Sequence, residues 1–511
     1  MASRRSRAAI GSAAPAVALA VFAALACAPA ARALDWRIQP TLEASAIYTD
    51  NANHSEDDPE GSLILRATPG FTLQSEGSRR VQATLQYGLT GVTRFDARDN
   101  TDLLHKLNGV GKAELVEDFL FIDGSARISQ ELISLQGSLV EAEISDNNRA
   151  TVGTYLVSPY IQKRIGTFAN AEARYSASGA IFENDVASNS SVNTYSAALI
   201  SGTRFTDLSW GLNYSYRDAT NRNFADSTFE RASATLGYAL TRKFRIFGTV
   251  GDEWNDYLTA TENDGSFYSA GFGWAPSRRT SLEVAAGERY FGNTWNVSAR
   301  HRTRVSNWHV TYLEDLSDIS QFLFTSGTLY DYLCPGPDGS LLFISDWPFS
   351  FPPAPGCIAF GGTPGVVFDL RNGVFVSTVL RAGVSWGIGK LNYSLEAFDS
   401  LREYEVSQSE DRTQGVTAGV TYRIAPKTSA NGSLSLTRYE TSNVISSRVF
   451  GASPGTQDRD DDIYRLSLGV SHEFDPDVSG TLTFQHQQRD SNLASGDFTE
   501  NRLTGTVNMR F

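Results

Sequence analysis

The sequence predicts an all-β fold: a transmembrane antiparallel β-barrel of about 22 strands, within a range of roughly 18 to 24, with short periplasmic turns and long extracellular loops. Three observations predict it. Apolar and polar residues alternate at period two over most of the chain, the alternating segments are about ten or more residues long, and short connections alternate with long ones.

The alternation gives each predicted strand one apolar and one polar face. In 81–90, valine, alanine, leucine and tyrosine at odd positions alternate with glutamine, threonine and glycine at even positions. Successive side chains of a strand point to opposite faces, so this period indicates a strand and not a helix. About ten residues cross a bilayer with tilt, whereas strands of globular sheets average about five or six. Candidate strands include 62–76, 191–206 and 305–324.

Connections between these segments follow a parity that favours a membrane barrel over a soluble sandwich. If the first strand starts in the periplasm, every second connection is a short periplasmic turn and the others are extracellular loops. The short connections lie at 76–78, 117–118, 241–243, 275–277, 389–390, 425–427 and 475–477. The longer connections, which are often acidic, lie at 50–61, 134–149, 184–191, 326–372 and 441–460.

Residues 1–33 are expected to form a signal peptide. Arg4, Arg5 and Arg7 precede an apolar stretch at 13–26, and Ala31-Arg32-Ala33 supplies a cleavage site. A lipoprotein acceptor at Cys27 is the alternative, and it is disfavoured because Ala24 stands where a larger aliphatic residue is expected. The expected mature chain, 34–511, is one outer-membrane β-barrel of a Gram-negative bacterium.

The C-terminal segment is typical of outer-membrane barrels. Val507, Met509 and Phe511 share one face of an alternating strand that ends on the terminal aromatic residue. This pattern resembles the signal read by the barrel assembly machinery, which we therefore expect as a partner. Interfacial girdles are expected from aromatic residues near strand ends, namely Tyr48, Trp210, Trp254, Trp274, Trp308 and Trp386.

Charge and composition argue against several classes of function. The whole chain has 44 Lys+Arg and 57 Asp+Glu; removing the four arginines of 1–33 leaves 40 against 57, a net charge of −17. Such an acidic chain is a poor nucleic-acid partner. The six histidines are scattered, so no metal site and no cofactor is predicted. Acids at 56–58 and 458–462 suit solvated loops; divalent cations among lipopolysaccharide phosphates are the alternative.

One sequence matches a catalytic motif. Gly383-Val384-Ser385-Trp386-Gly387 fits G-x-S-x-G, which in α/β-hydrolases places a nucleophilic serine on a sharp strand-to-helix turn. Here the motif lies within a predicted strand and no helical pattern follows it. Ser385 is therefore expected to line the lumen, and the chain is not expected to be an enzyme.

The connection 326–372 is too apolar for a solvated loop. Its part 329–360 alone contains 13 large apolar residues, and their exposure would cost about 25 cal/mol per Å². Its prolines argue against a regular strand pair, and Cys334 and Cys357 can close a disulfide across them. One hypothesis is that this extracellular loop folds over or into the outer mouth, with Trp347, Phe349 and Phe351 as pore-constriction candidates. The alternative is packing on neighbouring loops alone.

Four stretches carry a resemblance to a known family. They are 63–73 (LILRATPGFTL), 157–161 (VSPYI), 287–295 (GERYFGNTW) and 302–315 (RTRVSNWHVTYLED). Through them the chain resembles the outer-membrane β-barrels associated with PEP-CTERM/exosortase and exopolysaccharide loci. The resemblance implies a barrel that serves an exopolysaccharide-producing surface system; it implies no catalytic residue.

Three functions compete at this stage. A porin-like or export conduit, with polysaccharide as a possible solute, agrees with predicted lumen faces rich in Gln, Thr, Ser, Arg and Glu. The alternative is an occluded structural or receptor barrel that acts through its extracellular loops. A barrel enzyme on lipid or lipopolysaccharide needs a Ser/His/acid set that the sequence does not supply. Leu34-Asp35-Trp36 leads directly into the first strand, which disfavours an energised transporter with its own plug domain.

Overall fold

The computed structural model describes residues 35–76, 80–95, 101–132, 149–183, 189–222, 225–259, 262–318, 330–335, 341–347, 358–359, 373–407, 409–442, 458–493 and 496–511. For 330–335, 341–347 and 358–359 the description covers the backbone alone. The predicted signal peptide 1–33 and the residues Phe349, Phe351 and Cys357 lie outside the described residues.

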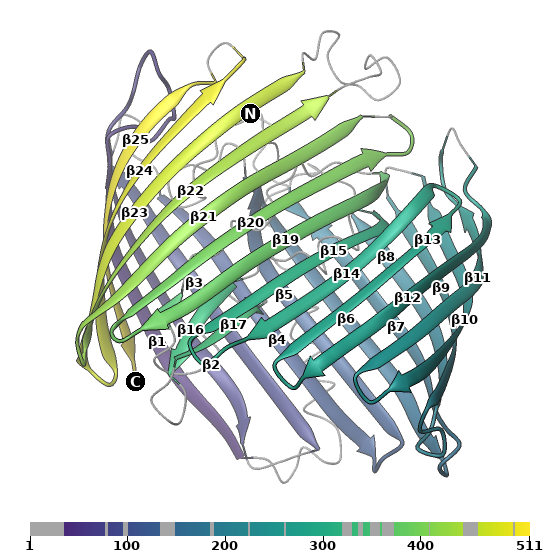
Figure 1. Ribbon diagram of the computed structural model, residues 1–511. Coiled ribbons are helices and arrows are strands. Elements are labelled where there is room, and N and C mark those ends of the chain that lie inside the picture. The colour runs from purple at the N-terminus through teal and green to yellow at the C-terminus, as the bar shows by residue number, and fades with distance from the viewer. Residues whose placement is uncertain are drawn as a thin grey trace.

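Twenty-two strands pair into one closed antiparallel sheet, which confirms the predicted barrel and its strand number. Each strand pairs with the next along the chain, β19 follows β15 directly, and β1 closes the barrel against β25. Figure 1 shows the strands crossing the wall obliquely to form a tube. The barrel strands are β1 (Asp35–Thr49), β2 (Ser62–Glu76), β3 (Val81–Phe95), β4 (Thr101–Val116), β5 (Leu120–Leu132), β6 (Arg149–Ile165), β7 (Ala169–Phe182), β8 (Ser190–Ser201), β9 (Leu208–Asn221), β10 (Ser227–Thr241), β11 (Phe244–Asp256), β12 (Gly265–Ser277), β13 (Thr280–Arg289), β14 (Gly292–Arg302), β15 (Ser306–Asp318), β19 (Val374–Ile388), β20 (Leu391–Tyr404), β21 (Glu410–Ala425), β22 (Thr428–Ser442), β23 (Arg459–Asp475), β24 (Val478–Ser491) and β25 (Phe498–Arg510).

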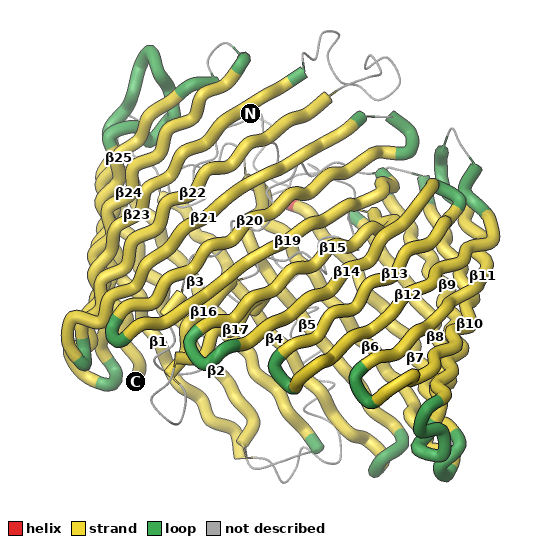
Figure 2. Tube along the Cα trace, in the orientation of Figure 1, coloured by secondary structure: helices red, strands yellow, loops and turns green. Residues whose placement is uncertain are grey.

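The connections divide the barrel into two ends. Short turns such as 389–390 and 426–427 lie at one rim, which we call the turn end. The longer connections lie at the other rim, the loop end, and the half of the wall beside it is the loop half. Figure 2 shows that the wall between the rims is almost entirely strand. The predicted parity is confirmed with two exceptions: two residues alone, Tyr290 and Phe291, join β13 to β14 at the loop end, and six residues, 202–207, join β8 to β9 at the turn end.

The two faces of the wall differ in chemistry. On the outer face large apolar side chains are exposed, among them Leu436, Tyr464 and Leu468 on the adjacent strands β22 and β23. The alternate residues of the same strands, such as Thr437 and Asp461, point inward and are buried. Exposed aliphatic surface is costly in water, so the outer face suits lipid. No helix among the described residues is long and apolar enough to cross a membrane.

Aromatic side chains mark both borders of the apolar band. All six predicted girdle residues lie on the outer face near strand ends, and Trp295 joins Tyr48 and Trp254 at the loop end. On β11 the outward residues from Phe244, which pairs with Trp274, to Trp254 span ten residues. At about 3.3 Å per residue and a tilt of about 40°, this spacing covers about 25 Å of membrane.

A charge placed on this band should destabilise the barrel strongly. Val250 lies on the outer face near the middle of β11, and it is 61% exposed. We expect Val250→Arg to lower the free energy of unfolding in lipid vesicles by about 2–4 kcal/mol, since a guanidinium would face hydrocarbon. The control is Ser269→Arg on the inner face of β12, which should change stability far less. Equal losses in the two variants would show that the outer face is misassigned.

The long connection contains regular strands, contrary to the expectation drawn from its prolines. Tyr330–Pro335 (β16) pairs with Leu341–Trp347 (β17), and Ile358–Ala359 (β18) pairs with the other edge of β16. The expectation was wrong because Pro335 stands at the last position of β16, where a missing backbone donor costs little. This sheet shares no pairing with the barrel sheet among the described strands.

Candidate functional site

Many inward residues of the loop half are buried. Tyr48 and Leu63 are exposed on the outer face, whereas the inward residues beside them are closed to water. The buried inward residues near the loop end include Thr49, Ile64, Val92, Arg94, Phe375, Arg402, Tyr404, Asp461 and Glu500.

One buried ion cluster lies on β23 and β24. The Asp461 carboxylate lies 2.6 Å from Arg459 Nε and accepts a hydrogen bond from Arg489 at 2.7 Å. The three side chains are only 1–3% exposed. Neither solvent nor salt screens ion pairs in a site closed to water, so loss of one partner there lowers the free energy of unfolding strongly.

A second network lines the inner face of strands β9 to β15, the strongly curved part of the wall that we call the corner. Glu253 lies 2.8 Å from Arg289 and 3.4 Å from Arg231, and Arg289 also donates to Asp315 at 2.7 Å. The guanidinium of Arg231 lies over the ring of Phe267, 4.3 Å from its centroid. These contacts link five strands of the inner wall, β10 to β13 and β15.

An ion pair and a tyrosine pair tie this corner together at its rim. Arg217 of β9 binds Asp318 at the end of β15, although five strands separate these two in the sheet. Beside them the hydroxyls of Tyr257 and Tyr290 lie 3.0 Å apart. Burial raises the pKa of Tyr257 to about 12 and also raises the pKa of Tyr290, so both remain protonated at neutral pH. The opposite walls are therefore joined at the loop end.

The connection 50–61 reaches across the seam where β1 meets β25. The Asp50 carboxylate accepts from the backbone and side-chain amides of Asn501, at 2.7 and 2.8 Å. His54, at φ 50°, stacks on Phe498 with ring centroids 3.8 Å apart, and its Nε2 lies 3.3 Å from Glu500. Burial lowers the pKa of His54, so the imidazole is neutral at pH 7.

A polar groove opens on the inner wall at mid-height between β7 and β10. Its volume is about 400 Å³. Glu172 lies at one side and Arg231 at the other, and the floor between them carries serine and alanine side chains. This part of the inner wall is half-buried or exposed, in contrast to the loop half. The lining side chains that point inward are Glu172, Ser196, Ala198, Asn213, Ser215, Arg231 and Ser233.

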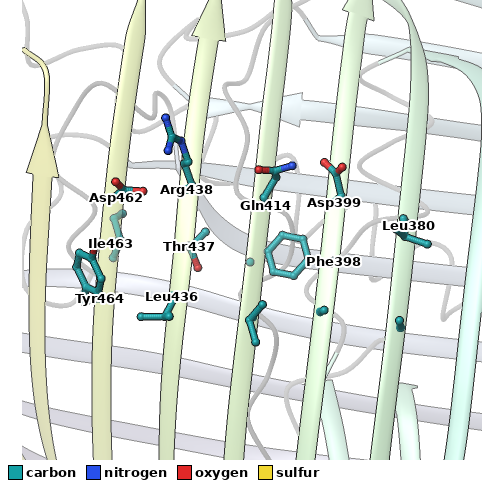
Figure 3. A pocket seen from close by; sticks show the side chains of 14 residues that line it. Leu380, Phe398, Asp399, Gln414, Leu436, Thr437, Arg438, Asp462, Ile463 and Tyr464 are labelled. Atoms are coloured by element: carbon teal, nitrogen blue, oxygen red, sulfur yellow. The ribbon is translucent and has the colours of Figure 1, made fainter.

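A second hollow of about 410 Å³ lies on the outer face, between β19 and β23 (Figure 3). Its upper edge is a polar row of Asp399, Gln414, Arg438 and Asp462, which are in register on four adjacent strands. Apolar side chains such as Leu436 lie below that row. The hollow therefore sits on the border between the polar rim and the apolar band, outside any path through the lumen.

The residues singled out from the sequence lie apart from these networks. Ser385 stands inside β19, and β20 follows after a short turn without a helix, so it has no nucleophile turn. Val507 and Met509 face outward on β25, and the backbone N–H of Phe511 donates to Pro40 on β1 at 3.0 Å.

Cys334 and Trp347 are described as backbone in β16 and β17, and the proposed disulfide and constriction otherwise fall outside the described residues. Within the described ranges no group of three or more metal-ligating side chains occurs.

Sequence reasoning expected Arg and Glu on the lumen face, but it did not find which of these charges pair. The available signal was the parity of charges within strands: Arg231, Glu253 and Arg289 all stand at odd positions, opposite the outward Tyr238, Trp254 and Glu288. Which of these charges meet depends on the register between strands, and alternation within one strand does not carry that information.

No protein-family model matches the sequence, and no curated protein matches it either. Solved structures of similar shape include the siderophore receptor PirA from Acinetobacter baumannii, with a TM-score of 0.49, 9% identity, and coverage of 93% of this chain and 80% of that chain. The FrpB iron transporter from Neisseria meningitidis gives a TM-score of 0.48 at 9% identity, covering 93% of this chain and 82% of that one. PirA from Pseudomonas aeruginosa gives 0.47 at 9% identity, covering 93% and 80%. The chain is thus similar in shape to these barrels.

Proposed function

We propose that the chain is an outer-membrane receptor barrel, occluded on its loop half, that binds a polar solute or polymer. One observation carries the proposal: many inward residues near the loop end, Arg402 and Glu500 among them, are buried. A passive pore needs a hydrated lumen through its whole length. The receptor alternative is therefore preferred to the open export conduit, and no catalytic step is part of the proposal.

The polar ligand is proposed to belong to the surface polysaccharide system to which the family resemblance points. Support comes from the chemistry of the inner wall, where serine, asparagine and paired charges line the groove between β7 and β10. Lipid of the outer membrane and the barrel assembly machinery remain proposed partners. An open conduit is the second candidate, and it is favoured by the exposed inner face of the turn half, where Arg245 pairs with Glu283.

Planar-bilayer recordings test the proposal. We expect the purified, heat-modifiable protein to show no steady ion conductance, because the loop half of the lumen is closed to water. A general porin reconstituted in the same bilayers serves as the positive control. Steady, ohmic conductance from the folded barrel would overturn the receptor proposal and support the conduit.

A further inference from the structure

The groove between β7 and β10 is built from two rows of inward residues that are in register. Arg174, Ser196, Ser215 and Arg231 form the first row, one residue from each of four adjacent strands. Glu172, Ala198, Asn213 and Ser233 form the second row beside it. The small side chains at the middle of both rows leave the hollow, and the two arginines stand about three strand spacings apart, roughly 14 Å.

The polar side chains of the floor have no hydrogen-bond partner among the residues that the structure describes. Ser196, Ser215, Asn213 and Ser233 make no side-chain hydrogen bond to any described residue, although the first two face each other in register, as do the last two. Elsewhere on the wall neighbouring hydroxyls bond to each other, as for Ser158 with Ser176 at 2.8 Å and Thr235 with Thr249 at 2.9 Å. The floor therefore offers three hydroxyls and a carboxamide to a ligand, and both groups donate and accept.

The two arginines at the borders of the groove are each held in ion pairs with carboxylates. Arg174 binds Asp123 at 2.9 Å and Glu172 at 3.0 Å, and its guanidinium lies 3.7 Å from the centroid of the Tyr160 ring. Arg231 is paired with Glu253 at 3.4 Å. Each border cation thus has a carboxylate beside it, so the groove has no excess positive charge to attract an anion.

We infer that this groove binds an uncharged polyhydroxylated ligand, a sugar unit, through the hydroxyls of Ser196 and Ser215 and the amide of Asn213. The inference deepens the proposed function and rests on it. A saccharide offers hydroxyls that both donate and accept, which matches serine and asparagine side chains better than a charged solute does. Guanidinium and carboxylate groups fixed in ion pairs keep spare donors and acceptors for the same ligand.

Isothermal titration of the detergent-solubilised barrel tests the inference with two probes, maltohexaose and a hexameric oligogalacturonate. Maltohexaose is expected to bind, and the charged hexamer at least tenfold more weakly. Ser215→Leu, which fills the groove, should weaken maltohexaose binding at least tenfold, whereas Ser215→Thr keeps the hydroxyl and most of the affinity. The matched control is Ser467→Leu on the inner face of β23, outside the groove, which should leave binding unchanged.

Three outcomes would overturn the inference: no binding of maltohexaose to the wild-type barrel, tighter binding of the charged hexamer, or equal weakening by the two leucine variants. These outcomes are distinct from failure of the receptor proposal. A barrel that conducts steadily yet binds maltohexaose through Ser215 contradicts the occlusion and leaves the groove intact. A barrel that shows no steady conductance and binds no maltohexaose supports the occlusion and contradicts the sugar site in the groove.

Discussion

Replacement of Asp461 by alanine is expected to lower the free energy of unfolding by about 3–5 kcal/mol, because it removes one partner of a buried ion cluster. Arg459 and Arg489 both form ion pairs with the Asp461 carboxylate, and all three side chains are closed to water. Without the carboxylate, two guanidiniums stay buried side by side. Neither their desolvation nor their mutual repulsion is then compensated.

The measurement is equilibrium unfolding in denaturant with the barrel in lipid vesicles, and the matched control is Asp460→Ala. Asp460 is the next residue along β23, faces outward, is 42% exposed and pairs with Arg438. An exposed pair of this kind is worth about 0–1 kcal/mol. If the free energy of unfolding fell by similar amounts in the two variants, the inner face of β23 would be open to water. That result would contradict the proposed occlusion of the loop half.

The fold could be predicted from the sequence because the period-two pattern and the parity of connections act along one strand at a time. The segment 62–76 has the bounds of β2, whereas the segment 191–206 extends past Ser201, the last residue of β8; residues 319–324 of the segment 305–324 lie outside the described residues. The end of β8 is set by its neighbour, because Ser201 pairs with Ala169, the first residue of β7. A strand cannot extend its ladder beyond its partners, and alternation within the strand does not reveal where a partner begins.

The site could not be predicted, because it is a property of register and closure. Arg174, Ser196, Ser215 and Arg231 meet only when four strands align, and a slip of one residue would turn any of them to the lipid. The pair Arg217 and Asp318 also depends on the curvature of the wall at the corner, which brings strands together that are not neighbours in the sheet. Spacing in the sequence carries no trace of that curvature.

The seam between β1 and β25 is the one place where adjacent barrel strands come from opposite ends of the sheet's sequence, so its loop end needs fastening. The connection 50–61 supplies side chains that hold the loop end of this seam together. Asn51 donates to the backbone carbonyl of Thr499 at 2.9 Å, and Thr49 donates to Glu500 at 2.7 Å. His54 adds a contact from the loop to the same carboxylate. The backbone hydrogen bonds between β1 and β25 are therefore covered by side chains that include two titratable groups, His54 and Glu500.

The stability of this fastening is expected to fall as the pH is lowered through about 6.5. Burial, followed in size by the opposing contact with Glu500, leaves the pKa of His54 below its ordinary value of 6.5, and Arg502 and Arg465 lower it further. Above that pH the imidazole is neutral in the folded and unfolded states, so it has no effect on the pH dependence. Below it the unfolded chain takes up a proton that the folded barrel resists, and the unfolding free energy decreases until the folded pKa is reached.

Unfolding should be followed between about pH 7 and about pH 5.5, above the range in which exposed carboxylates titrate. His54→Asn, which tolerates the positive φ and does not titrate, should flatten the decline. The matched control is His472→Asn, at an exposed histidine near the turn end that contacts Thr428, and it should keep the wild-type slope. If His54→Asn and the wild type declined in parallel, the pH dependence would have to arise elsewhere in the barrel, and His54 would hold the seam by its stacking on Phe498 alone.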